Sequence, residues 1–203
     1  MNEKANSQLK LFLPLLAGLP LWYWLAYETP RQDFLQLITL FTLLFGAYGL
    51  VVHHAKSYKA YLWCLGYAIG YRLLLFPALP WLSDDVFRFI WDGRLLAQGI
   101  DPFAHLPSYY IEGAGAAKPL TGINENLYNS LNSPEYFTIY PPLNQWLFAL
   151  TGFVFPKSIF GSIVLIRSFI FLLEAGSLVL LEKLRQYFNL PYKTVLLFFL
   201  NPL

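Results

Sequence analysis

Apolar positions gather in four long stretches that are typical of membrane-spanning helices. They cover residues 9–27, 34–52, 58–79 and 159–181. Each stretch has about 19–23 residues, or about 30 Å of α-helix, which matches the hydrocarbon thickness of a bilayer. The pattern predicts an all-α fold, a polytopic transmembrane helical bundle. A fifth apolar stretch starts near residue 194 and is cut off at residue 203, so we expect the chain to be the N-terminal part of a longer protein.

The apolar run 140–156 is harder to assign. It is short, it begins with a Pro-Pro pair, and it contains Asn144 and Gln145. These features favour an interfacial or re-entrant helix over a further membrane span. The chain is then expected to have three parts: residues 1–80 with three spanning helices, residues 81–158 as a large polar loop, and residues 159–203 with another span, a turn and the start of a further helix.

Positive charges on the short connections predict the orientation. Basic connections stay in the cytoplasm. Two lysines, Lys4 and Lys10, lie before and at the very start of the first apolar stretch, so the N-terminus is expected inside and the loop 81–158 on the extracytoplasmic side. No small-x-small cleavage site follows the first stretch, which favours a retained helix over a cleaved signal. A basic turn also follows the second stretch, with His53, His54, Lys56 and Lys59.

Composition agrees with a membrane protein and narrows the function. The chain is 57% hydrophobic and 13% charged, whereas a soluble domain carries about 25% charged residues. The net charge of +2 and the scattered basic residues give no reason to expect a nucleic-acid partner. The single cysteine, Cys64, excludes an intrachain disulfide and CxxC metal or redox motifs.

Arg72, Arg167 and Glu174 lie away from the ends of the apolar stretches, where charge is costly. Arg72 is expected to extend outward to a lipid phosphate. Arg167 and Glu174 are seven residues apart, so they share a helix face and are expected to pair with each other or with neighbours.

The polar loop begins with a segment that predicts an amphipathic helix on the membrane surface, SDDVFRFIWDGRLLAQ over residues 83–98. Ser83 is the expected N-cap, and Gly99 ends the helix. Its polar side chains share one edge. At 100° per residue, roughly one 100° arc holds Asp84, Asp85, Arg88 and Asp92.

This polar edge allows two interpretations, and spacing alone leaves both open. In the functional one, a carboxylate near the bilayer has a raised pKa and acts as a general base, or Asp84 and Asp85 bind a divalent cation that binds phosphate. In the structural one, the carboxylates cap the helix and form an internal Asp–Arg ion pair.

The string SDDVFRFIWDGRLLAQGIDPF, together with the later string SPEYFTIYPPLNQWLFAL, resembles the first outer loop of membrane glycosyltransferases of the GT-C class. The likeness is greatest to bacterial mannosyltransferase-like members, which are related to the enzyme that adds the first mannose to GPI anchors. The resemblance covers most of the chain from Leu82 onward, including the string LLEKLRQYFNLPYKTVLLFFLNPL.

The resemblance implies a GT-C-like bundle in a bacterial inner or plasma membrane. It implies an enzyme that moves a sugar, by resemblance mannose, from a polyprenyl-phosphate donor to an acceptor hydroxyl on the outer face. The acceptor would be a glycan, a lipid or a protein. The family's essential acidic residue falls on Asp85, with Asp84 as its rival and Asp92 as a second acidic group.

The same resemblance suggests residues that bind the substrate. Arg88 and Arg94 are candidates for the donor phosphate, because a guanidinium can pair with phosphate bidentately. Tyr140, in the YPP string, is a candidate for stacking on a sugar ring. Mg²⁺ or Mn²⁺, held by Asp84 and Asp85, is the one cofactor that the residues suggest.

Two other classes of function compete with the glycosyltransferase. A transporter or lipid flippase should show charges in several spans and an internal repeat of helices, and no repeat is evident. A non-catalytic membrane subunit would explain a short chain but not the clustered DD, D and YPP elements.

Overall fold

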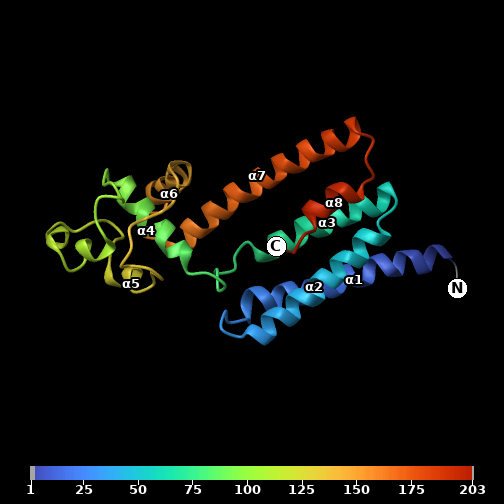
Figure 1. Cartoon of the computed structure of the whole chain (residues 1–203), viewed down its shortest axis with the longest axis horizontal. Helices are drawn as coiled ribbons and strands as arrows, with labels where there is room; N and C mark the ends of the chain where they lie inside the picture. Colours follow the sequence, from blue (N-terminus) through green and yellow to red (C-terminus); the bar gives the residue numbers. More distant parts are fainter. Residues whose placement is uncertain (1–2, 203) are drawn as a thin grey trace. The chain divides into compact units, whose positions relative to one another are not determined.

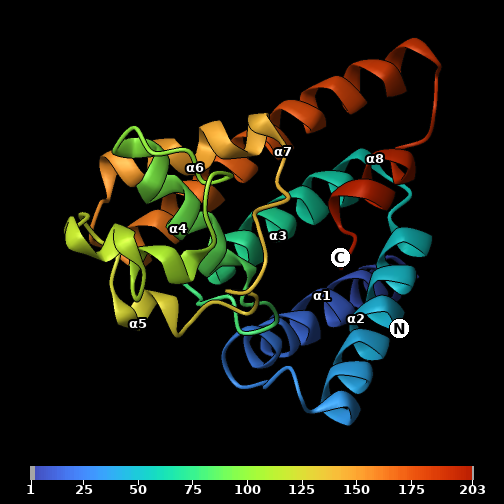
Figure 2. The ribbon, with the colours of Figure 1, turned by 60° about the vertical axis from the view of Figure 1, so that its left-hand side comes forward.

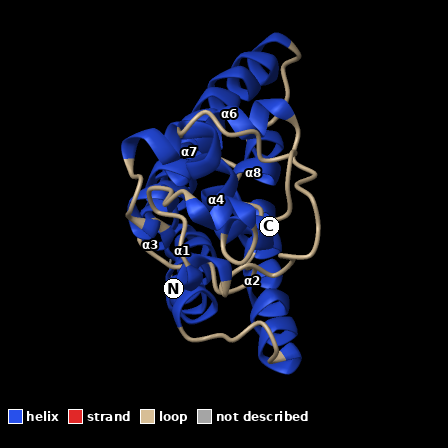
Figure 3. Cartoon of the chain, turned by 90° about the vertical axis from the view of Figure 1, so that its left-hand side faces the viewer, coloured by secondary structure: helices blue, strands red, loops and turns tan. Residues whose placement is uncertain are grey.

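The computed structural model describes residues 3–202, and the side chains from Leu9 onward. All regular secondary structure in this range is helical (Figure 3). The chain divides into two compact units. Unit 1 contains residues 1–81 and 171–203, and unit 2 contains residues 82–170. The all-α prediction is confirmed. Lys4, on which the predicted orientation partly rests, has its side chain outside the described residues.

Unit 1 is built from helices that pack around an apolar core. Helix α1 packs against α2 and α3, and the short helix α8 packs against α2 and α3 (Figure 1). Leu44, Cys64 and Leu196 are buried in this core. The Tyr48 hydroxyl of α2 donates a hydrogen bond to the carbonyl of Leu197, 2.8 Å away. The helices are α1 (Glu3–Tyr27), α2 (Phe34–His54), α3 (Tyr58–Leu75), the later part of α7 (Ile159–Tyr187) and α8 (Lys193–Phe199).

Three helices are long and apolar enough to cross a membrane: Leu9–Tyr27 within α1, α2 and α7. The remaining predicted span, 58–79, is not among these three helices. Helix α3 ends at Leu75 and contains a lysine, an arginine and several tyrosines. These polar side chains lower its hydropathy, so α3 is a helix of unit 1 without the composition of a span.

Of the charged residues in the apolar helices, Glu174 pairs with a neighbouring helix, as the sequence allowed, whereas Arg72 has a partner that the sequence did not suggest. Arg72 does not extend to a lipid phosphate, because it binds Glu174. Its Nε and Nη2 donate to the Glu174 carboxylate at 2.7 and 3.2 Å. Its Nη1 donates to the carbonyl of Phe199 at 3.0 Å, and the guanidinium lies 4.3 Å from the centre of the Phe199 ring. This cluster links α3, α7 and α8.

Unit 2 folds the predicted polar loop around a second core. Val86, Trp91 and Leu95 of α4 are buried with Leu127 and Ile163. The start of α7 belongs to this unit. The other elements are α4 (Asp85–Ala97), the 3₁₀ turns η1 (Pro107–Tyr110) and η2 (Ala114–Ala117), α5 (Glu125–Tyr128) and α6 (Pro142–Val154).

Helices α4 and α6 lie in backbone contact, and glycines make this possible (Figure 2). A Cβ atom on Gly93 would overlap the backbone carbonyl oxygen of Phe148. A Cβ atom on Gly152 would overlap the carbonyl oxygen of Gly93 and lie 2.9 Å from the Ala97 Cβ. Small residues permit close helix approach. The crossing fixes the position of Asp92, which precedes Gly93.

Helix α6 has 13 residues, so it is about 20 Å long, shorter than the roughly 30 Å hydrocarbon core of a bilayer. One of its faces, with Gln145, Phe148 and Thr151, is buried. The opposite face is exposed and apolar, with Leu143 80% and Trp146 77% exposed. A short helix with one uncovered apolar face has the features of an interfacial helix.

Candidate functional site

The carboxylates of Asp84 and Asp85 lie at the start of α4. The helix begins one residue later than expected: Asp84 is the N-cap residue, and its side chain makes no capping bond. The Ser83 hydroxyl accepts a hydrogen bond from the backbone N–H of Asp85, 3.2 Å away. The prediction of Ser83 as N-cap is therefore wrong by one position, although its hydroxyl does satisfy an N–H of the first turn.

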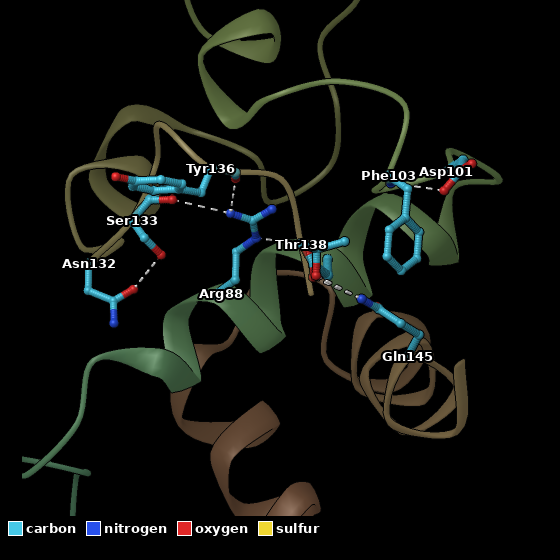
Figure 4. A network of polar contacts seen from close by, with 9 residues as sticks. Arg88, Asp101, Phe103, Asn132, Ser133, Tyr136, Thr138 and Gln145 are labelled. Carbon is cyan, nitrogen blue, oxygen red and sulfur yellow. Dashed lines mark hydrogen bonds and ion pairs between the residues drawn. The ribbon is translucent and has the colours of Figure 1, made fainter. Parts of the chain in front are cut away.

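One turn further along, Arg88 and Asp92 form a buried ion pair. The Nε of Arg88 lies 2.9 Å from Oδ1 of Asp92, and the residues are 3% and 0% exposed. The other carboxylate oxygen, Oδ2, accepts hydrogen bonds from the Thr138 hydroxyl at 2.5 Å and from Nε2 of Gln145 at 3.0 Å. Gln145 reaches this cluster from α6 (Figure 4). Both oxygens of Asp92 are thus occupied by protein donors.

Arg88 also binds the backbone of the segment 133–138. Its Nη1 donates to the carbonyl of Tyr136 at 2.9 Å and to that of Ser133 at 3.4 Å, and Figure 4 shows the guanidinium pointing at this backbone. The expectation that Arg88 and Asp92 lie on an open polar edge at the membrane surface is therefore wrong. Charges can be buried when partners satisfy them, and here the covering segment and α6 supply those partners.

Asp85 differs from Asp92 in its surroundings. It is only partly buried. Its Oδ1 accepts one hydrogen bond, from Nδ2 of Asn132 at 2.7 Å. The Asn132 amide is oriented in turn by the Ser133 hydroxyl, which donates to its Oδ1 at 2.9 Å. Because Asp85 sits in the first turn of α4, the helix dipole also stabilises its negative charge. The carboxylate is positioned, but it keeps an open side.

Tyr140 lies close to this carboxylate. Its ring packs edge-on against Phe89, with ring centres 4.8 Å apart. Burial raises the pKa of the Tyr140 phenol, the carboxylates of Asp85 and Asp92 raise it further, and Arg88 opposes them. The phenol therefore stays protonated at neutral pH and can donate a hydrogen bond. The structure thus brings together four of the predicted site residues: Asp85, Arg88, Asp92 and Tyr140.

Arg94 is not part of this group. It follows Asp92 by two positions, which turns it about 200° around the helix. Arg94 is 2% exposed, and its Nη1 donates to the carbonyl of Gly122 at 2.7 Å. Its Nε and Nη2 have no hydrogen-bond partner, and burial lowers the pKa of the guanidinium. Gln98, one turn later, exchanges two hydrogen bonds with the backbone of Thr121. Arg94 and Gln98 thus anchor a loop.

The donors for a metal ion are sparse at this site. Among the residues that the structure describes, no three His, Cys, Asp or Glu side chains gather closely enough to hold one. Asp92 is occupied by Arg88, Thr138 and Gln145. Asp84 and Asp85 would supply only a partial set of ligands, since a divalent cation such as Mg²⁺ takes six. These residues alone do not fit a protein-bound metal.

Three residues that shape the site were not predicted as site residues from the sequence: Asn132, Ser133 and Thr138. They lie more than forty positions after Asp85 and contact α4 only through folding. Gln145 carried a signal, because it is a polar residue within an apolar helix. It is 4% exposed, and its Oε1 has no partner.

Comparison with known proteins gives no relative: no protein-family model, no curated protein and no solved structure matches the chain. Neither the fold of unit 2 nor its polar cluster can therefore be assigned to a family by similarity.

Proposed function

We propose that this chain belongs to a membrane glycosyltransferase that transfers a sugar from a polyprenyl-phosphate donor to an acceptor hydroxyl on the outer face. One observation carries the proposal. Asp85 has a partly exposed carboxylate that accepts a hydrogen bond from Asn132 at 2.7 Å, interacts electrostatically with a protonated Tyr140 and lies on the same helix as the buried Arg88–Asp92 pair. A positioned carboxylate with an open side is what a general base requires.

Two further features support this proposal. The chain combines three helices of spanning length and composition with a separately folded unit of mixed polarity. A lipid-linked donor requires such a combination, because its isoprenoid chain stays in the bilayer while the sugar reacts in water. The resemblance of the strings at residues 83–103 and 133–150 to the first outer loop of GT-C enzymes is the second feature, and mannose is the sugar that it suggests.

In the proposed reaction, the acceptor hydroxyl gives its proton to Asp85 as its oxygen attacks the anomeric carbon of the donor sugar. The bond between that carbon and the phosphate oxygen breaks, and polyprenyl phosphate leaves with the bonding electrons. A single displacement of this kind inverts the anomeric configuration. Tyr140 can donate its phenolic hydrogen to a substrate oxygen, which would stabilise negative charge as it develops.

Arg88 and Asp92 have a different part in this proposal. Nε and Nη1 of Arg88 and both carboxylate oxygens of Asp92 have protein partners, so we assign this pair the task of holding the segment 133–138, which follows Asn132. Asp84 remains the alternative base. Arg94 is buried against Gly122, and its role is to anchor the loop that contains Gly122. No step requires Mg²⁺ or Mn²⁺, although an added cation bound partly by the donor phosphate stays compatible with Asp84 and Asp85.

The test is a transfer assay with the full-length protein in membranes. The donor is radiolabelled polyprenyl-phosphate mannose, and the acceptor is a membrane extract. Three variants are compared with the wild type: Asp85→Asn, Asp84→Asn, and Glu125→Gln as a control that neutralises an exposed carboxylate elsewhere in unit 2. Loss of a general base reduces a rate by about 10²–10⁴-fold.

The expected result is transfer by the wild type and by Glu125→Gln, with loss in Asp85→Asn at unchanged protein level. Loss in Asp84→Asn alone would move the base by one residue. Full transfer by both aspartate variants would reject this site. No transfer by the wild type, with mannose or with a panel of other polyprenyl-phosphate sugars, would favour a non-catalytic membrane subunit.

A further inference from the structure

Unit 1 has a basic groove where the end of α2 meets the start of α8. Its volume is about 800 Å³, within the range of small-molecule sites. His53, Lys56 and Lys193 line it with positive or protonatable groups, and Val52, Pro191 and Leu197 give it an apolar wall. We call this hollow the basic groove.

A second hollow of about 250 Å³ adjoins the first and shares Lys56 with it. Its lining adds Lys59, His54 and the Ser57 hydroxyl, beside the ring of Trp63. Among the side chains that the structure describes, from Leu9 onward, no aspartate or glutamate lines either hollow. Lys56 therefore stands between two hollows that are both positively charged.

The nearby carboxylate of Glu182 does not offset this charge. Arg185 donates to both of its oxygens, at 2.9 and 2.7 Å, and lies 4.4 Å from the centre of the Tyr192 ring that lines the groove. Tyr61 donates to Glu182 as well, at 3.0 Å. The charge of Glu182 is thus compensated by Arg185, and the basic groove keeps an excess of positive charge from its lysines.

The dipole of α2 explains only part of this arrangement. Cations are favourable in the last turn of a helix, which accounts for His53 and His54, and Nδ1 of His54 lies 2.8 Å from the carbonyl of Leu50. Lys56 lies beyond the helix end, and Lys193 comes from the start of α8, where the dipole disfavours a cation. The preference for basic residues on cytoplasmic connections allows both lysines, but it does not require that they line one hollow with an apolar wall.

We propose that the basic groove binds an anionic phospholipid. Lys56 and Lys193 hold the headgroup phosphate, and an acyl chain lies along Val52 and Leu197. Two observations favour a lipid. The groove is at the end of α2, one of the three helices long and apolar enough to span, where headgroups of a leaflet would lie. Its apolar wall continues onto exposed side chains, since Leu197 and Phe198 are each 50% exposed.

The proposal is independent of the glycosyltransferase reaction, and its test requires no donor or acceptor. The protein is purified in detergent, and binding of phosphatidylglycerol and of phosphatidylcholine is titrated by native mass spectrometry. The variant is Lys56→Gln/Lys193→Gln. The matched control is Lys118→Gln/Lys157→Gln, which removes the same charge from exposed positions in unit 2. A thermal scan of each protein verifies folding.

We expect the wild type to bind phosphatidylglycerol more tightly than phosphatidylcholine. Each lysine near a headgroup contributes about fivefold in affinity, so the groove variant should lose about 25-fold and the control less than about twofold. Equal affinity for the two lipids, or equal losses in the variant and its control, would overturn the proposal.

A third arm distinguishes the lipid from its free headgroup. Glycerophosphoglycerol, the deacylated form of phosphatidylglycerol, has the same phosphodiester without acyl chains. It should not displace the lipid at equal concentration, because the apolar wall contributes to binding. Displacement at equal concentration would show that the groove selects the phosphate alone, and would refute the lipid assignment.

Discussion

Removal of the Asp92 carboxylate should destabilise unit 2 strongly. In Asp92→Leu, Arg88 keeps its charge in a site where it is 3% exposed, with no carboxylate to compensate it. Thr138 and Gln145 lose their shared acceptor at the same time. The loss should also loosen the segment 133–138, because Arg88 orients that segment only while Asp92 fixes its guanidinium.

The magnitude follows from burial. Removal of one partner of a buried ion pair costs about 3–5 kcal/mol, because the remaining charge is uncompensated. Asp85→Leu, seven positions earlier on the same helix, removes a carboxylate that is partly exposed and has one hydrogen bond from Asn132. Water can solvate what remains, so this control should cost about 1 kcal/mol.

The assay is equilibrium unfolding by denaturant in detergent micelles, followed through the fluorescence of Trp91, which is 1% exposed in the core of unit 2. The other tryptophans are replaced by phenylalanine to isolate this signal. The free energy of unfolding is measured for Asp92→Leu, Arg88→Met, the double variant and Asp85→Leu. A double-mutant cycle then gives the coupling between Arg88 and Asp92 directly.

The double variant should cost about 2 kcal/mol less than the sum of the single variants, within the range for residues in one charged network. Additive effects would refute a stabilising ion pair in this site. Equal costs for Asp92→Leu and Asp85→Leu would contradict the difference in burial on which the proposed roles depend.

Three further predictions concern other contacts. Gly152→Ala should destabilise the protein by about 1–3 kcal/mol through overpacking. Its control, Gly176→Ala, adds a methyl group where nothing lies within 4 Å and should be neutral or stabilising by up to about 1 kcal/mol. Equal thermal unfolding midpoints for the two variants would contradict the close crossing of α4 and α6. Glu174→Gln should lower the unfolding midpoint in detergent, because Arg72 loses its ion pair, and an unchanged midpoint would argue against that pair. Tyr140→Phe should lose less stability than the wild type as pH rises above about 10, the pKa of a tyrosine in the unfolded chain. The raised pKa of Tyr140 in the folded state stabilises the wild type below that pH, and this stabilisation is lost as pH rises through the folded-state pKa. Parallel curves of stability against pH for the two proteins would exclude this contribution.

The apolar periodicity was sufficient to predict helices and several of their limits. The starts of α2, α3 and α7 lie at 34, 58 and 159, as expected from the sequence. An internal Asp–Arg ion pair was one of the two interpretations that the polar arc left open, and the structure has it between Arg88 and Asp92, because an i, i+4 spacing places two residues on one helix face. The limit of this reasoning is seen at 58–79, where overall apolarity suggested a span that the polar side chains of α3 do not support.

The sequence by itself determined which long segments are helical and that carboxylates cluster at the start of α4, whereas it predicted four membrane spans and the structure has three helices of that length and composition. Only the tertiary structure decided which carboxylates are covered. Asn132, Thr138 and Gln145 lie 46–53 positions from the aspartates that they bind, and no local periodicity encodes such pairs. The glycine contact between α4 and α6 places Gln145 beside Asp92, and the segment before α6 supplies Thr138, so Asp92 is buried among donors while Asp85, on the same predicted edge, remains partly open. Burial of a charge depends on partners from distant segments, and those partners exist only after the chain has folded.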